Sequence, residues 1–89
     1  MNRYSVTILD RPDYPLDVET YSCPACEAAR HTDMAAGDVI FFVIDGLISR
    51  VEQLDDDGQV FFCEQSSDKK ARAEIAANGA TSAFHKKKP

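Results

Sequence analysis

The sequence predicts a small α+β domain, and three observations indicate this fold class. Two runs near the N-terminus alternate apolar and polar side chains, as half-buried strands do. Three further strand-like runs follow in the middle of the chain and are separated by glycine-containing turns. Two alanine-rich runs begin with residues that favour helix starts. We expect one domain over residues 1–80, followed by a basic flexible tail at residues 81–89.

The first expected element is an N-terminal β-hairpin. Tyr4, Val6 and Ile8 alternate with polar residues, so their side chains should share one face of a strand. Residues 16–20 repeat this alternation and form the second strand. The intervening residues 10–15 contain two prolines, which fix φ and lack an N–H group. We expect that segment to form a turn or loop.

A short helix, or instead a metal-binding knuckle, is expected at the CxxC pair, Cys23 and Cys26. The proline between them suits the first position of a helix. The helical pattern covers residues 27–36, and Gly37 is the expected C-terminal stop. Polar residues near its end have weak helix propensity, which keeps the knuckle open as an alternative.

The middle of the chain predicts a three-stranded antiparallel meander. Residues 39–44 are apolar on both faces, which is typical of a strand in the centre of a covered sheet. The dipeptide Asp45–Gly46 favours a two-residue type I′ turn. Residues 47–54 form the return strand, residues 55–58 a second turn, and residues 59–65 the third strand.

The two turns also predict which side chains share a face. We expect Ile44 to lie opposite Leu47, and Leu54 opposite Gln59. This register predicts one face with Ile40, Phe42, Val51 and Phe62, and another with Phe41, Val43, Ile48, Phe61 and Cys63. We expect the CxxC segment to cover the face that carries Cys63. An error of one residue in the second turn would reverse that assignment.

A C-terminal helix completes the predicted fold. Ser66 and Ser67, followed by an acidic residue, favour a helix start. The helix should run to about Asn78 and end at Gly79. Its apolar stripe is thin, with Ile75 as the single large member. We expect that side to rest on the sheet and the lysines and arginine to face water.

Charge and composition limit the function classes. The net charge is −5, with 13 acidic and 4 basic residues up to position 65, and 2 acidic and 6 basic residues after it. An acidic body repels nucleic acid and membrane surfaces. The N-terminal residues lack the apolar stretch of a signal peptide, and the longest apolar run has six residues. We therefore expect a cytoplasmic protein without a membrane span, whose open sheet edge allows a homodimer.

The three cysteines are the candidate site. Cys23, Cys26 and Cys63 can supply three thiolates to a zinc ion, which prefers four ligands. His31 or His85 would supply the fourth. In a helix, His31 lies roughly 140° around the axis from Cys26, so it fits the knuckle better. A plainer interpretation takes Cys63 as a small buried hydrophobe and the CxxC pair as incidental.

A redox function is the alternative use of the same thiols. The string Val-Glu-Thr-Tyr-Ser-Cys-Pro-Ala-Cys at residues 18–26 resembles the active-site entry of glutaredoxin-like proteins. The resemblance implies a thiol–disulfide oxidoreductase that uses Cys23 and Cys26, and Arg30 would stabilise a thiolate there. That family also has a cis-proline facing the dithiol and a helix between its second and third strands. Here no proline lies between Pro24 and Pro89, and Asp45–Gly46 reverses the chain.

The function expected from these patterns is a small acidic, non-catalytic binding or regulatory module that docks onto a protein partner and is supported by zinc. No complete catalytic group of residues is recognisable, and the chain is too small to enclose a large ligand. Its size and charge are similar to those of phage proteins that inhibit host machinery. An acidic mimic of nucleic acid is a further alternative, and it requires the carboxylates to gather on one face.

Overall fold

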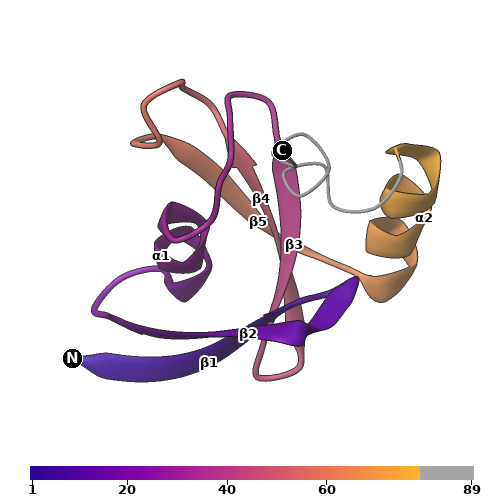
Figure 1. The fold of residues 1–89 in the computed structure, drawn as a ribbon. Coiled ribbons are helices and arrows are strands. Elements are labelled where there is room, and N and C mark those ends of the chain that lie inside the picture. The colour runs from indigo at the N-terminus through magenta and orange to yellow at the C-terminus, as the bar shows by residue number, and fades with distance from the viewer. Residues whose placement is uncertain (79–89) are drawn as a thin grey trace.

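The computed structural model describes residues 1–78, which form a five-stranded antiparallel sheet with one helix on each side (Figure 1). The sheet order is β2-β1-β3-β4-β5. The α+β class and the predicted order of strands and helices are confirmed, whereas the domain end at residue 80 and the tail 81–89 lie outside the described residues. The elements are β1 Asn2–Ile8, β2 Arg11–Thr20, α1 Pro24–Arg30, β3 Val39–Ile44, β4 Leu47–Gln53, β5 Phe61–Ser66 and α2 Asp68–Asn78.

The N-terminal hairpin has a tighter turn than expected. Strand β2 begins at Arg11, directly after the turn, so the predicted loop over residues 10–15 is wrong. Both prolines of that segment lie within β2. They are tolerated because β2 is an edge strand, where a residue can lack an N–H group without breaking the ladder. Strand β1, the other strand of the hairpin, pairs with β3 and so joins the hairpin to the meander. Val6 of β1 lies opposite Ile44 of β3.

The first turn of the meander is the predicted one. Asp45 and Gly46 both have positive φ, 52° and 79°, as a type I′ turn requires. Ile44 lies opposite Leu47, as predicted. Strand β3 lies in the middle of the sheet, between β1 and β4, as its apolar sequence indicates.

The second turn is wider than predicted, and the predicted register is wrong by one residue. The Asp55 carboxylate accepts hydrogen bonds from the backbone N–H groups of Gln59 and Val60, which holds a loop rather than a tight turn. Gln53 therefore lies opposite Phe61, and Val51 opposite Cys63. Because side chains alternate between faces, this shift moves the side chains of β5 to the opposite faces from those predicted.

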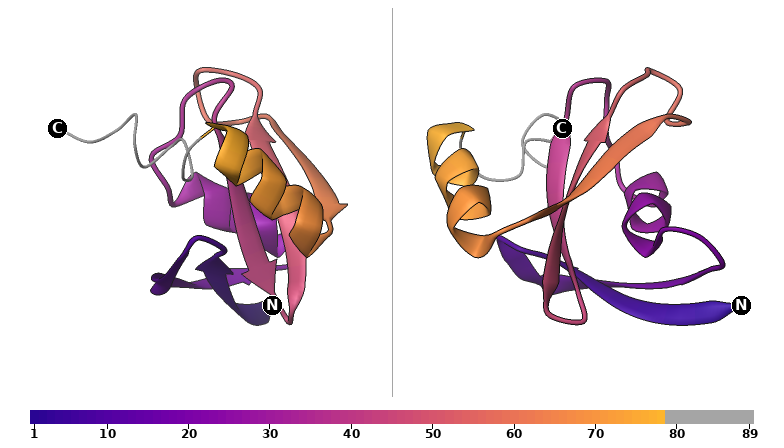
Figure 2. Two further views of the ribbon diagram at one scale, coloured as in Figure 1. Left: turned by 90° about the vertical axis from the view of Figure 1, so that its right-hand side faces the viewer. Right: turned by 180° about the vertical axis from the view of Figure 1, so that it is seen from behind.

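The two faces of the sheet carry separate apolar cores. The inner face carries Ile40, Phe42 and Val51 and is covered by α1, as Figures 1 and 2 show. The outer face carries Phe41 and Ile48 and is covered by α2. Cys63 belongs to the inner face, so its predicted grouping with Phe41 is corrected, while the prediction that the CxxC segment covers the face of Cys63 agrees with the fold. The buried members of the inner core are Val6, Ile8, Val18, Ala25, Ala28, Ala29, Met34, Ile40, Phe42 and Val51.

Helix α1 is shorter than predicted and is a helix rather than a knuckle. It ends at Arg30 instead of continuing to residue 36. The Thr32 hydroxyl donates a 2.7 Å hydrogen bond to the Ala29 carbonyl, so the polar residues terminate the last turn. The chain then reverses before β3 through Gly37, which has a φ of +88°. This loop is fixed by the buried Asp38, whose carboxylate accepts the Ala35 N–H at 2.9 Å.

Helix α2 packs on the sheet, as predicted, and covers its outer face. The Ser67 hydroxyl accepts the Lys70 N–H at 3.1 Å and caps its first turn. Ala71 is fully buried against the sheet, and Ile75 is partly buried beside it. Neither described helix is long and apolar enough to cross a membrane.

Candidate metal centre

Two cysteines of the candidate centre are positioned by the start of α1. Cys23 is the N-cap residue, and its sulfur accepts the backbone N–H of Cys26 at 3.4 Å. Pro24 occupies the first turn, where its missing N–H costs no helical hydrogen bond. The fully buried Ala25, Ala28 and Ala29 press the helix closely against the inner face. The local sequence thus directs the CxxC pair towards the sheet.

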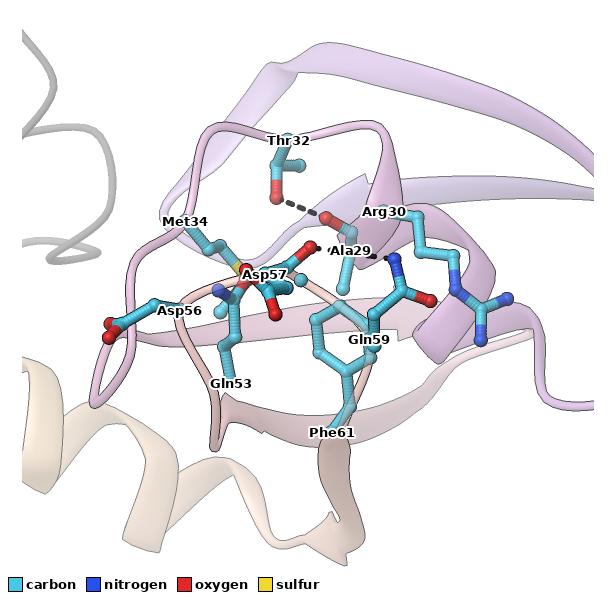
Figure 3. Close-up of a pocket in the computed structure, with 10 residues that line it drawn as sticks. Ala29, Arg30, Thr32, Met34, Gln53, Asp56, Asp57, Gln59 and Phe61 are labelled. Carbon is cyan, nitrogen blue, oxygen red and sulfur yellow. Dashed lines mark hydrogen bonds between the residues drawn. The ribbon is translucent and has the colours of Figure 1, made fainter.

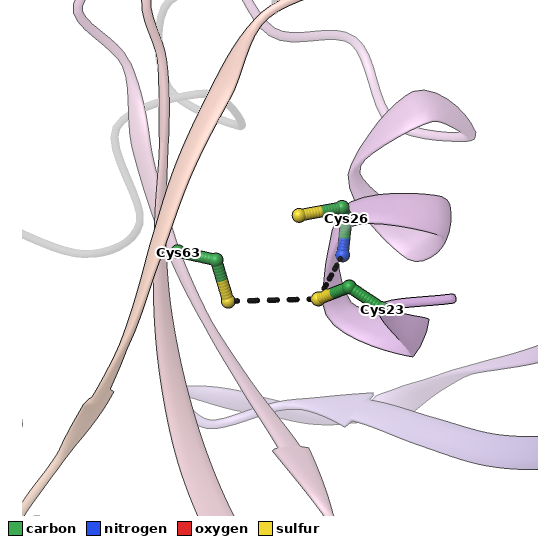
Figure 4. Close-up of side chains that lie close together, drawn as sticks. All are labelled: Cys23, Cys26 and Cys63. Atoms are coloured by element: carbon green, nitrogen blue, oxygen red, sulfur yellow. Dashed lines mark hydrogen bonds between the residues drawn. The ribbon is translucent and has the colours of Figure 1, made fainter.

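The third cysteine comes from strand β5 and meets this pair. The sulfur of Cys63 lies 3.7 Å from that of Cys23, and all three sulfurs lie within 4.8 Å of one another (Figure 4). Three thiolates bound to one zinc ion at ~2.3 Å in a tetrahedral arrangement would be about 3.8 Å apart. The three cysteines are free, partly buried thiols. They lie close enough to one another to hold a metal ion.

The thiols differ in their tendency to ionise. Burial opposes ionisation of Cys23, but hydrogen bonds from the Cys26 backbone and from the two other thiols outweigh it and lower its pKa. Burial, together with the hydrogen bond and the negative charge of Cys23, raises the pKa of Cys26 to about 12. Burial and the charge of Cys23 likewise raise the pKa of Cys63 to about 11. Ionisation of Cys23 is thus favoured over that of the other two thiols, and a bound cation would favour the ionised form of all three.

His31 does not join the sulfurs. It follows α1 directly, and its Nε2 lies 3.2 Å from the Glu27 carboxylate. Its side chain is 57% exposed. Within residues 1–78, no histidine or carboxylate completes the group formed by the three sulfurs. The structure therefore brings together Cys23, Cys26 and Cys63 of the predicted ligands and leaves His31 apart, while His85 lies outside the described residues.

Sequence reasoning missed one contact of the centre. The Ser49 hydroxyl of β4 hydrogen-bonds to the Cys63 thiol and favours its ionised form. Ser49 lies opposite Phe42, so its side chain is on the inner face. The predicted register placed Cys63 on the other face, so it could not indicate a contact between Ser49 and Cys63. The observed register of β5 places both residues on the inner face.

A polar pocket of about 350 Å³ lies between the end of α1 and the loop that joins β4 and β5 (Figure 3). Arg30 lines one side, and its guanidinium lies 5.9 Å from the centre of the Phe61 ring. Asp56 and Asp57 line the loop side. The sequence placed Arg30 near the thiols, whereas in the structure its guanidinium lies over the Phe61 ring and pairs with the Glu27 carboxylate at 3.1 Å.

The carboxylates are spread over the described surface. Several are paired with arginines on different elements: Arg3–Glu19, Arg11–Asp13, Arg30–Glu27, Arg50–Glu74 and Arg72–Asp68. Such pairing neutralises local charge on both sides of the sheet.

Comparisons of this chain with protein-family models, with curated proteins and with solved structures gave no match. The site is therefore interpreted from its own geometry and chemistry.

Proposed function

We propose that this protein is a small, non-catalytic docking module whose fold is supported by a zinc ion bound to Cys23, Cys26 and Cys63. The observation that carries the zinc assignment is the spacing of the three sulfurs, which fits the edges of a zinc–thiolate tetrahedron. Zinc also explains why Cys26 and Cys63, whose pKa values burial and the negative charge of Cys23 raise, lie beside that residue. A divalent cation would stabilise all three thiolates.

The zinc ion would join two elements that are far apart in the sequence. Cys23 and Cys26 belong to the start of α1, and Cys63 lies forty residues after Cys23 on the edge strand β5. Helix α1 has seven residues, which is too short to be stable alone in water. A bond network from its first turn to β5 supports the helix, as structural zinc sites do in other small domains.

The proposed docking surface lies where the loop of residues 54–60 joins β4 to β5. Leu54, Val60 and Phe62 keep about half of their surface exposed, at 52%, 49% and 48%. Leu54 donates its N–H to the Val60 carbonyl at 2.8 Å, so these two residues are adjacent. Glu52 lies opposite Phe62, and the loop that joins the two strands carries three consecutive aspartates, so acidic residues flank the apolar ones. A partner with basic side chains around an apolar centre would fit this surface.

Metal content is the experiment that tests the zinc assignment. The full chain is purified without chelator, its zinc is measured by mass spectrometry, and its free thiols are titrated before and after chelation. We expect one zinc per chain and thiols that react fully only after chelation. Cys63→Ser should lower zinc content strongly, whereas His31→Ala, the matched control, should keep it. Zinc far below one per chain would exclude the assignment.

Thiol–disulfide exchange is the second candidate, and the lowered pKa of Cys23 favours it. Two features of the glutaredoxin-like pattern are absent. The sequence has no proline between Pro24 and Pro89, and β3 joins β4 by a tight turn instead of a helix. Reduction of a mixed-disulfide substrate by the zinc-free protein, lost in Cys23→Ser, would favour this function over docking.

A further inference from the structure

The three-sulfur centre formed by Cys23, Cys26 and Cys63 is arranged for a disulfide as well as for a metal ion. The sulfurs of Cys23 and Cys63 lie 3.7 Å apart and face each other across the space between α1 and β5 (Figure 4). A disulfide brings two sulfurs to about 2.05 Å, so a small movement of these side chains is enough to form one. All three cysteines are partly exposed, so a small oxidant can reach them from solvent.

We propose that this centre is a redox switch, in which a hydroperoxide converts Cys23 and Cys63 into a disulfide and thereby releases the zinc ion. This inference rests on the proposed zinc site and adds the means by which that site is regulated. The disulfide replaces the metal link between α1 and β5 by a covalent bond between the same two elements. A dithiol reductant would restore the thiols and, with them, the metal site.

The oxidation proceeds in two steps. One thiolate sulfur attacks an oxygen of the hydroperoxide, the O–O bond breaks, and the sulfur becomes a sulfenic acid while an alkoxide or hydroxide leaves and takes a proton from water. The second thiolate attacks the sulfenic sulfur, the S–O bond breaks, the S–S bond forms, and hydroxide leaves and is protonated. The two sulfurs together lose two electrons, and the hydroperoxide gains them.

The backbone around the centre favours the Cys23–Cys63 disulfide over one within the CxxC pair. Cys23 is the N-cap residue, with extended backbone angles of φ −76° and ψ 114°, so its side chain can turn towards Cys63 without unwinding α1. Cys26 lies within the first turn of the helix, where its backbone N–H is bound to the Cys23 sulfur at 3.4 Å. A Cys23–Cys26 disulfide would also leave α1 without a covalent link to β5.

The number of thiols makes metal binding and disulfide formation mutually exclusive. A disulfide consumes two of the three clustered sulfurs, and Cys26 is then the single thiolate left in the centre. Structural zinc sites usually need four ligands, so one thiolate from this group does not retain the ion. The same three residues therefore define a metal-bound state and an oxidised, metal-free state.

Peroxide treatment of the zinc-loaded full chain tests this inference. Hydrogen peroxide is added at one equivalent per chain, zinc release is followed with a colorimetric indicator, and fragmentation of linked peptides identifies the cysteines of the disulfide. We expect one zinc ion to be released for each disulfide formed, and we expect Cys23 to be linked to Cys63. Dithiothreitol should restore both the thiols and zinc binding.

Two variants form a matched pair, because each removes one thiol of the centre. In the reduced, metal-free protein, Cys26→Ser should form the disulfide as wild type does, whereas Cys23→Ser should lower its yield about tenfold or more. Hydrogen exchange of wild type gives a readout that does not depend on how the variants fold. The oxidised, metal-free protein should keep the protection of α1 and β5, and the reduced, chelated protein should lose it.

The outcomes separate this inference from the proposed function. Absence of zinc before peroxide is added would overturn the proposed function and, with it, the release step. Zinc-loaded protein that keeps its zinc in peroxide, or that forms a Cys23–Cys26 disulfide or a sulfinic acid instead, would overturn the switch and leave the zinc site intact.

Discussion

The two helices attach to the same sheet in different ways. Helix α1 has seven residues, three of which are fully or almost fully buried alanines, and its first turn holds two of the three clustered thiols. Helix α2 has eleven residues, but of these only Ala71 is buried, and an ion pair between Arg50 and Glu74 supports it. The shorter helix is thus the more tightly packed one. Helix length and helix anchoring are independent in this fold, since tertiary contacts supply most helical stability.

Metal removal should have the largest effect on the free energy of unfolding. The accompanying loss of hydrogen-exchange protection should be confined to the elements that the metal joins on the inner face. If zinc joins α1 to β5, the chelated protein should have a free energy of unfolding about 5 kcal/mol or more below that of the protein kept in micromolar free zinc. Chemical denaturation with and without chelator measures this change. Hydrogen exchange should accelerate in α1 and β5 while α2 keeps its protection. Equal loss of protection in α2 would contradict the separation of the two faces.

Adjacent phenylalanines of β3 offer a matched test of the two cores. Phe42 is fully buried on the inner face, and Phe41 is 3% exposed on the outer face. Phe42→Ala should destabilise the protein by about 5 kcal/mol, because closely packed alanines cannot collapse into the cavity. Phe41→Ala should cost about 3 kcal/mol, because the thin contact with α2 can adjust. Urea denaturation of both variants measures the difference, and a larger cost for Phe41→Ala would reverse the comparison.

The pH dependence of stability should change sign with metal. In the metal-free protein, the folded pKa values of Cys26 and Cys63, about 12 and about 11, lie above their ordinary value of 9.0. Their contribution to stability is therefore complete below pH 9 and is lost as the pH rises towards 11 and 12. Cys23, whose pKa is lowered, contributes in the opposite direction.

Zinc reverses this trend because protons compete with the metal for the thiolates, so the loaded protein loses stability as the pH falls. Thermal denaturation of both forms across the pH range measures the two slopes. A metal-free protein whose stability rises steadily above pH 9 would contradict the raised pKa values.

The ion pair on the outer face should have a smaller effect. The Arg50 guanidinium donates to both carboxylate oxygens of Glu74, at 3.0 and 3.3 Å from its Nε, and both side chains are partly buried. Arg50→Gln should lower the free energy of unfolding by about 1–2 kcal/mol, mainly by loosening α2. Arg72→Gln is the control, because its pair with Asp68 is exposed and should be worth less than about 0.5 kcal/mol. Equal effects in thermal denaturation would show that the Arg50 pair does not anchor the helix.

The smallest effect on stability is expected at the proposed docking surface. Val60→Ser removes an apolar side chain that is half exposed, so the free energy of unfolding should change by less than about 0.5 kcal/mol. Association with a partner should weaken much more than that, because the same side chain would be buried in the complex. Calorimetry measures binding, and the melting temperature shows that the variant is folded. Unchanged binding by a folded Val60→Ser variant would show that Val60 is not part of the proposed docking surface.

Most of the fold could be predicted because local signals agreed with the tertiary structure. The alternation in β1, the apolar run of β3 and the Asp45–Gly46 turn each favour a single conformation. The second turn could not be predicted, because its register depends on hydrogen bonds from the Asp55 side chain to the loop backbone. That one-residue difference determines the face of Cys63.

The candidate site was predicted in part for a similar reason. The CxxC spacing identifies two thiols from the sequence alone, and Cys63 was included because it was the only other sulfur of its kind in the chain. Its approach to Cys23 within 3.7 Å depends on how α1 packs on the sheet. The position of His31 depends on where that helix ends, and helix ends are the least certain part of a sequence-based prediction.

The two prolines of β2 make the sheet's outermost strands unequal. Each proline removes a backbone donor from one border of the sheet, and such borders resist intermolecular pairing. Strand β5 forms the other border and contains no proline. Aggregation by strand addition would therefore begin at β5, next to Cys63, and metal loss and self-association would be coupled through that strand.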